Sequence, residues 1–376
     1  MILALSLLLF PQNDKTQANS RDDAWESAWV THSRAVYTTT GKIAGKVLHI
    51  GDSITYSNPY GQWPRNGLGR TAEDDAIRIW CHADDGNPPS LSATDPNGFY
   101  LAAVDVPSSN RSLTAASGIT AGEYLSGSGQ SGTAMPSTTD TPTAQGYVAS
   151  SSYGGNLHIT TVAAAFADAQ FAVVMLGTND FGRPVADFSN DLTAVVNALE
   201  GRNIVVILST IPPRSGGDAT PYNTAIRTLA STRGLPLIDY YEEILARRPG
   251  TTWQNTLISG DGIHPTAPNS SADPYAGGNA AIHQTGVNAT NDGYLLRGWL
   301  TMQKLKEVKS YVADGVNPPS TPPPAPPAPP PAPPAVGSSG SDNDNGNGCG
   351  CGTATSPGLP WAALALLSLA WVARRK

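Results

Sequence analysis

The sequence predicts an α/β protein in three layers, with a parallel sheet covered by helices on both faces. Four short runs are continuously apolar rather than alternating, which is typical of strands buried on both sides. These runs occupy residues 46–50, 171–176, 203–208 and 235–239. Two stretches with helical periodicity, 188–199 and 221–232, separate the later runs. Because strand and helix alternate along the chain, we expect parallel pairing through crossover helices.

The predicted domain spans residues 35–316 and closes with a helix at 294–311. Residues 1–34 form an extension ahead of it. A long segment, 81–156, follows the first strand; it is rich in Gly, Ser, Thr, Asp and Pro and has no clear period. We interpret this segment as an insertion between the first two main strands, with room for short antiparallel strands of its own.

The composition narrows the class of protein. Lys, Arg, Asp and Glu make up 14% of the 376 residues, whereas an average soluble protein has about 25%. The net charge of −7 offers no basic surface for phosphates and argues against a nucleic acid partner. The cysteines, Cys81, Cys349 and Cys351, are too few for a disulfide framework or a Cys-rich zinc module. Low charge with abundant Gly, Ser and Thr fits an extracytoplasmic bacterial protein.

Both ends of the chain indicate export. Residues 1–10 (MILALSLLLF) form an apolar run that is too short to cross a bilayer but suits the core of a secretory signal. A basic start and a clear cleavage motif are missing, so an ordinary N-terminal core segment is the alternative. At the other end, residues 317–348 form a linker that is proline-rich and then polar. Such a composition favours an extended polyproline II spacer followed by flexible chain.

A tripartite tail follows the linker over residues 349–376. Cys349 and Cys351 lead into an apolar segment, 359–373, and a basic end, Arg374-Arg375-Lys376. As a helix this segment would reach about 22 Å, short of the roughly 30 Å hydrocarbon core. The tail resembles the Cys-containing sorting tails of myxobacterial surface proteins, which implies processing by a sorting protease and retention at the cell surface. A plain tail anchor is the alternative, and in both cases the domain is displayed from a membrane.

Polar motifs follow the predicted strands at the edge where parallel sheets gather their active residues. GDSIT (51–55) continues the first strand, GTND (177–180) ends the second, and DGIHP (261–265) follows the last strand and a helix. A serine is a poor nucleophile until a base takes its proton, so Ser53 needs His264 within hydrogen-bond reach.

The other polar groups of the motifs complete the chemistry. A base histidine needs a carboxylate on its second nitrogen, and Asp261 is well spaced to supply it. Asn179 can direct a side-chain N–H at a developing oxyanion. A glycine at the start of GDSIT permits a sharp turn that exposes the serine. Singly, each motif is also a common turn or loop, and Asp-x-x-His is also half of a metal site.

Together, in this order and at these strand ends, the motifs resemble the SGNH, or GDSL, serine hydrolase family over residues 46–266. The resemblance implies a flavodoxin-like sheet of about five strands. It implies that Ser53 is the nucleophile and first backbone oxyanion donor, with Asn179 as the side-chain donor. His264 is then the base and Asp261 its orienting partner. The α/β-hydrolase elbow does not apply, because the motif is not Gly-x-Ser-x-Gly.

The family also implies a second oxyanion glycine, which we assign to Gly118 within 116–121. Gly132 and Gly155 are rivals because the segment 81–156 blurs the spacing.

Other candidate residues have a structural interpretation beside the functional one. His49 lies inside the first strand and is expected to be a core histidine. Arg183 and Arg214 lie on active-edge loops, either as structural arginines or as substrate clamps. Aromatic side chains close behind the nucleophile could stack on a sugar ring or pack in the core or rim. These are Tyr56, Tyr60 and Trp63.

The sequence therefore favours a secreted, surface-held serine esterase without cofactor or metal. We expect short-chain O-acetyl esters on a polysaccharide as its substrate, because of the surface display and the nearby aromatic residues. A lipase or lysophospholipase is the alternative within the class. A glycan-binding surface module without turnover is the alternative outside it, and a metal hydrolase is less favoured because Asp261 and His264 have no third ligand at a convincing spacing.

Overall fold

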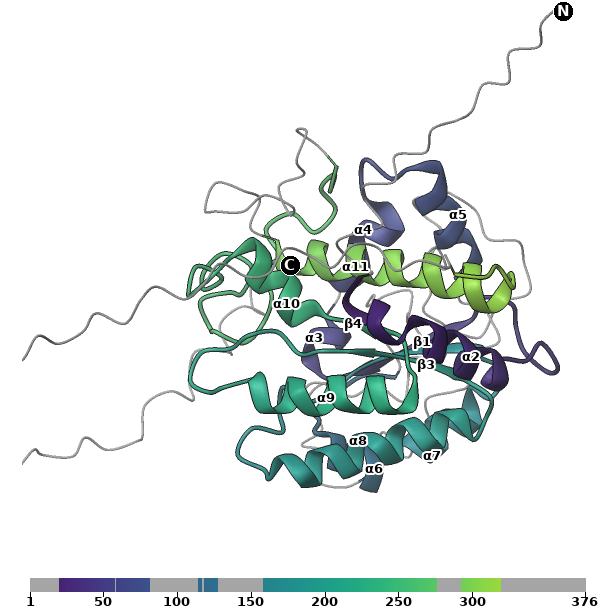
Figure 1. Cartoon of the computed structure of the whole chain (residues 1–376). Coiled ribbons are helices and arrows are strands. Elements are labelled where there is room, and N and C mark those ends of the chain that lie inside the picture. The colour runs from purple at the N-terminus through teal and green to yellow at the C-terminus, as the bar shows by residue number, and fades with distance from the viewer. Residues whose placement is uncertain are drawn as a thin grey trace, which may run out of the picture. The chain divides into compact units, whose positions relative to one another are not determined.

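A computed structural model of the chain describes residues 20–57, 59–81, 114–116, 118–127, 158–275 and 292–318 (Figure 1). The predicted secretory run, the linker beyond residue 318 and the sorting tail lie outside these residues, as do Gly132 and Gly155. In the part that is described, no helix is long and apolar enough to cross a membrane.

A parallel sheet forms the centre of the fold, as predicted. Its strands are β1 (Val47–Gly51), β2 (Phe171–Met175), β3 (Val205–Ser209) and β4 (Leu237–Ile238). They pair in the order β1-β2-β3-β4, and each pairing is parallel. Every residue of these strands is buried, which explains why each reads as a continuous apolar run.

β3 and β4 each begin two residues after the start of the predicted apolar run, for local reasons. Asn203 has a φ of 54°, so the chain is still turning and β3 begins only at Val205. Before β4, Pro236 has no N–H to pair, although its carbonyl accepts from Leu208 N at 3.0 Å. The N–H of Leu237 is taken by the carboxylate of Asp22 at 2.7 Å.

The free edge of β1 carries a further pairing. Ala115 forms an isolated parallel bridge with Gly51, and Ala116 N donates to Gly51 O at 3.2 Å. Beside it, the hydroxyl of Thr114 donates to His49 O at 2.6 Å. The described residues thus hold four strands and one bridge at the position of a fifth. Part of the predicted insertion, 114–127, therefore packs into the core instead of standing apart from it.

Helices cover both faces of the sheet. They are η1 (Ser20–Trp25), α2 (Glu26–Val36), α3 (Ser53–Tyr56), α4 (Pro59–Asn66), α5 (Ala72–Trp80), α6 (Ala121–Ser126), α7 (Ile159–Ala165), α8 (Val185–Glu200), α9 (Thr220–Arg233), α10 (Tyr240–Arg247) and α11 (Gly293–Val308), which continues as the π-helix η3 (Lys309–Ala313). α8 and α9 pack on β3, with α6 and α7 against α8, while α11 lies on the other side and contacts β4 (Figure 1). These layers confirm the predicted three-layer α/β fold.

A buried ionic cluster joins the two ends of the domain. Lys304 on α11 donates to both carboxylate oxygens of Asp22 at 2.9 and 3.0 Å and to Glu307 at 2.6 Å. Burial opposes the charge of the lysine, but the two carboxylates still raise the pKa of Lys304. Asp22 also caps the start of β4 through Leu237, so the cluster fixes the N-terminal helices, α11 and the sheet to one another.

Candidate active site

Ser53 stands at the carboxyl end of β1, where it is the first residue of α3. Asp52 caps this short helix and accepts from Ile54 N at 3.0 Å. The glycine of the motif is required by close approach: a Cβ on Gly51 would lie 2.6 Å from Met175 O on the neighbouring strand. The chain can therefore leave β1 tightly and present the hydroxyl of Ser53 at the edge of the sheet.

Three of the predicted site residues form one hydrogen-bonded chain. The Ser53 Oγ lies 2.8 Å from His264 Nε2, and His264 Nδ1 lies 2.6 Å from Asp261 Oδ2. Ser53 and His264 are separated by 211 residues in sequence, so only the fold brings them together. The order of atoms is the one that general-base activation of a serine requires.

Nearly half of the Asp261 side chain is exposed, and the carboxylate is held in its ionised form. Partial burial alone would raise its pKa, but the Ser259 hydroxyl and the N–H groups of Ile263 and His264 all donate to it. These donors hold the pKa of Asp261 well below its usual range. The side chain that orients His264 is therefore charged across the range of pH in which enzymes of this kind are assayed.

The loop that carries His264 is anchored to α11. Ser259 N donates to His264 O at 2.8 Å, which closes the loop on itself. Thr266 accepts from Tyr294 N at 3.1 Å through its carbonyl and from Gly293 N at 3.0 Å through its hydroxyl. A Cβ on Gly293 would come within 2.1 Å of Leu257 O, so glycine permits this contact. The position of His264 thus depends on a helix that the sequence motifs do not include.

A second contact from α11 holds the residues that follow Ser53. Arg297 is buried and donates to Ile54 O and to Thr55 Oγ1, both at 2.8 Å. Its guanidinium lies 3.8 Å from the ring centroid of Tyr60. Sequence reasoning missed Arg297. An arginine among the apolar residues of the first half of the closing helix was the signal available, because a buried charge needs fixed partners.

Asn179 and Gly118 lie on adjacent loops. Asn179 follows β2, and its Nδ2 donates to Ile119 O at 3.1 Å. Gly118 directly precedes Ile119 and has a φ of +79°, which a residue with a side chain adopts only with strain. One N–H of the Asn179 amide is used by this contact, so a second remains to serve a ligand.

The residue after Asn179 ties these two loops together. Asp180 is fully buried; its Oδ2 accepts from Ala121 N at 3.1 Å and its Oδ1 from Arg183 at 2.5 Å. Arg183 also binds Asp191 on α8 at 2.5 Å. Burial raises the pKa of Asp180, and the hydrogen bonds from Ala121 and Arg183 oppose that rise. Arg183 is therefore a structural arginine, and Asp180 is a positioning residue that the sequence analysis did not single out.

The remaining candidates divide between the core and the rim of the site. His49 is buried, with its Nδ1 2.7 Å from the hydroxyl of Tyr60, so it is a core histidine as predicted. Tyr60 and Trp63 are also buried, at 2% and 0% exposed, while Tyr56 is partly exposed. Arg214 donates to Thr178 O at 2.6 Å, next to Asn179. In the part of the chain described, no group of three or more metal-ligating side chains occurs.

Comparison with known proteins agrees with the motifs. The model of the GDSL-like Lipase/Acylhydrolase family matches residues 112–268, less than half of the chain. The matched residues include Asn179, Asp261 and His264 but not Ser53, which the structure places against His264. None of the curated proteins matches the chain in sequence. The family match supports a GDSL-type hydrolase that acts on esters.

Solved structures similar to the chain include three esterases or lipases of low identity. A carbohydrate esterase of family 3 from Talaromyces cellulolyticus is 16% identical, with 72% of this chain and 99% of that chain covered and a TM-score of 0.38. A GDSL-like lipase from Bacteroides thetaiotaomicron is 13% identical (78% and 100% covered, TM-score 0.36). An acetylxylan esterase from Geobacillus stearothermophilus is 13% identical (71% and 96% covered, TM-score 0.33). These values leave the substrate of this chain open.

Proposed function

We propose that this GDSL-type ester hydrolase is a serine esterase that forms an acyl-enzyme on Ser53, with short-chain O-acetyl esters of carbohydrate as its substrates. One observation carries the mechanism: the chain from Ser53 Oγ through His264 to Asp261, with distances of 2.8 and 2.6 Å, at the carboxyl edge of a parallel sheet. This is the geometry of an activated serine nucleophile.

In the acylation step, Ser53 Oγ attacks the ester carbonyl carbon while His264 Nε2 takes the hydroxyl proton. The imidazolium that results is stabilised by the ionised carboxylate of Asp261. The tetrahedral intermediate then collapses: its bond to the leaving oxygen breaks, and His264 returns the proton to that oxygen. The alcohol leaves, and the acyl group remains on Ser53.

The developing oxyanion would be met by three donors. Ser53 is the first residue of α3, so its backbone N–H has no acceptor within that helix. The second N–H of Asn179 Nδ2 and the backbone N–H of Gly118 are the other two, on loops that the Asn179 contact with Ile119 joins. Donors fixed before the reaction typically contribute about 100- to 1000-fold each in turnover.

In the deacylation step, a water replaces the alcohol. His264 removes its proton, the hydroxide attacks the acyl carbon, and the bond to Ser53 Oγ breaks as the proton returns to that oxygen. The acid is released and the enzyme is regenerated. Every step uses only side chains and backbone groups of this chain and one water.

The preference for carbohydrate and the cellular location are also part of the proposal. The apolar run at 1–10 and the tail at 349–376 support secretion and retention at the cell surface, where acylated polysaccharides are the accessible esters. A lipase is the alternative, favoured by the name of the matching family model. Hydrolysis of p-nitrophenyl esters of increasing length separates the two: activity that falls steeply beyond about four carbons supports the proposal, and activity that rises with length supports a lipase.

The nucleophile is tested with the full chain and two serine variants. We expect Ser53→Ala to lower kcat on p-nitrophenyl acetate by about 1000-fold or more, because the variant lacks the oxygen that attacks the ester and carries the acyl group. Ser231→Ala, which changes an exposed serine on α9, should leave kcat unchanged. Equal rates in wild type and Ser53→Ala would refute the proposed mechanism. Glycan binding in a wild-type chain that hydrolyses no ester would instead indicate a binding module.

A further inference from the structure

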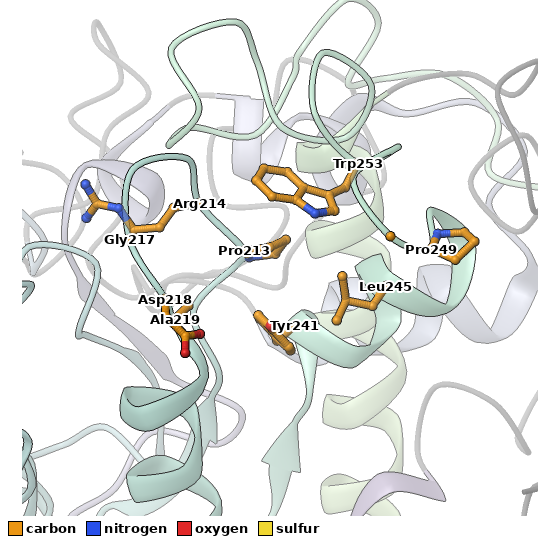
Figure 2. A pocket seen from close by; sticks show the side chains of 10 residues that line it. Pro213, Arg214, Gly217, Asp218, Ala219, Tyr241, Leu245, Pro249 and Trp253 are labelled. Carbon is orange, nitrogen blue, oxygen red and sulfur yellow. The ribbon is translucent and has the colours of Figure 1, made fainter. Parts of the chain in front are cut away.

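A cavity of about 390 Å³ is lined by the loop that follows β3, and the same loop contacts two loops of the candidate active site. The cavity lies between the loop that follows β3 and the segment that follows α10. Figure 2 shows the Trp253 indole on one side of it, with Pro213, Tyr241 and Leu245 facing the same space. Ligand pockets in proteins are commonly about 300–1,000 Å³, so the cavity is large enough to hold one small ring.

The loop that bounds the cavity also contacts the loops of the active site. Ser215 N donates to Gly262 O at 2.8 Å, next to Asp261. Arg214, in the same loop, donates to Thr178 O at 2.6 Å, next to Asn179, and lines the cavity as well. The loop that bounds the cavity therefore also contacts the residues adjacent to the orienting carboxylate and to the oxyanion amide.

The lining combines aromatic faces with a carboxylate. Trp253 is only 7% exposed, and Tyr241 is held through its backbone N–H, which donates to Thr210 Oγ1 at 2.9 Å. Asp218 is also among the residues that line the cavity, and its side chain is exposed. Hydrogen bonds from the hydroxyl and the backbone N–H of Thr220 lower the pKa of Asp218, which keeps it charged near neutral pH.

An ester substrate has an acyl part and an alcohol part, and this lining of aromatic rings and a carboxylate suits a sugar alcohol better than an acyl chain. An acyl chain seated here would displace water from an ionised carboxylate without replacing its hydrogen bonds, which is costly. A pyranose ring has an apolar C–H face for the rings of Trp253 and Tyr241 and hydroxyl groups at its edge that can donate to Asp218. Aromatic side chains bring a large contact area at a small entropic cost.

We propose that this cavity is a subsite for a sugar ring of the substrate, with Trp253 and Tyr241 as its stacking surface and Asp218 as its hydroxyl acceptor. The proposal rests on the serine esterase function and names the carbohydrate side of its substrate. The subsite places the sugar on the β4 side of the Ser53–His264 pair. Tyr60 and Trp63, which the sequence suggested for this role, do not line this cavity.

The kinetic test compares a substrate with a sugar ring and a substrate without one. We expect Trp253→Ala in the full chain to leave kcat/KM for p-nitrophenyl acetate unchanged. For mono-O-acetylated xylobiose kcat/KM should fall by about tenfold, mostly through KM, in line with the loss of one aromatic contact. Trp253→Phe keeps an aromatic face and should recover most of the loss. Equal thermal midpoints of the three proteins would show that the fold is intact.

Other kinetic results would overturn the proposal. An equal fall on both substrates would make Trp253 a structural residue, and no fall on either would leave the cavity outside the substrate path. A fall confined to p-nitrophenyl octanoate would make the cavity an acyl pocket.

A binding measurement keeps the subsite separate from the esterase function. Titration of unacetylated xylobiose into the Ser53→Ala chain, measured by isothermal titration calorimetry, should saturate, and the added Trp253→Ala change should abolish the saturation. If the wild-type chain hydrolyses no ester but this binding is observed, the esterase proposal fails and the subsite stands. Should turnover be normal while no sugar binds and Trp253→Ala has no effect, the subsite would fail alone.

Discussion

Asp180→Asn is the change that best tests how the fold sets the oxyanion site. Asp180 has no exposed side chain and connects two loops: it accepts from Ala121 N at 3.1 Å and from Arg183 at 2.5 Å. Ala121 lies three residues after Gly118, and Asp180 directly follows Asn179. The substitution keeps the shape of the side chain but replaces one acceptor oxygen with a donor NH₂ group.

The expected magnitude follows from those two contacts. Both partners of Asp180 are donors, so an asparagine satisfies one and leaves the other facing its NH₂ group. One buried donor without an acceptor costs about 1–3 kcal/mol of folding free energy. The loops that carry Gly118 and Asn179 then shift relative to one another. Because the oxyanion donors are displaced and not removed, we expect kcat to fall by about 10- to 100-fold, less than for the removal of a donor.

Kinetics on p-nitrophenyl acetate and urea unfolding measure the two effects. Asp191→Asn is the matched control: it contacts the other nitrogen of Arg183 at 2.5 Å, and its side chain is 19% exposed. An asparagine there still offers Arg183 an oxygen, so kcat should be retained. If Asp180→Asn kept both the wild-type kcat and the wild-type unfolding midpoint, Asp180 would not position the oxyanion donors.

Two further changes test the triad and the helix that anchors it. Asp261→Asn should lower kcat by about 100- to 10,000-fold at nearly constant KM, because His264 loses the carboxylate that orients it at 2.6 Å, and steady-state kinetics on p-nitrophenyl acetate measures this. Burial raises the pKa of Asp292, the N-cap of α11, to about 6. Between about pH 4 and 6 the folded protein therefore keeps a proton on Asp292 that the unfolded chain has lost. Stability from this group is therefore present below about pH 4 and is lost as the pH rises through 6. Urea unfolding at pH 4 and 7 should show a decline in wild type that is about 2–3 kcal/mol larger than in Asp292→Asn, and equal declines would contradict the assignment.

Much of the fold could be predicted because its signals are local. Residues 171–175 are apolar without alternation, a pattern typical of a strand buried on both faces. The helix at 185–200 has a periodic apolar face whose residues are all buried in the structure. These residues are Phe188, Leu192, Val195, Val196 and Leu199. Ser53 and Asn179 were predictable because their motifs directly follow strands, and Asp261 and His264 because their spacing completes the same set of motifs.

Other features required contacts between distant segments. The stretch 114–127 has no period of its own, and it joins the core because Ala115 pairs with Gly51 and α6 packs on α8. Whether an aromatic side chain meets solvent is also a tertiary property. Tyr60 lies close to the nucleophile in sequence but is buried, whereas Trp253 lines a cavity whose bounding loop contacts the loops of the site.

The sequence by itself determined which residue types could do the chemistry and that parallel strands would bring them to one edge, because backbone geometry makes these local and periodic properties. Only the tertiary structure decided the 2.8 Å contact between Ser53 and His264, the support of both by α11, and the link from Asp180 to Ala121. Such contacts join residues far apart in the chain, and they form only when burial of the whole apolar core offsets the entropy lost in bringing those segments together.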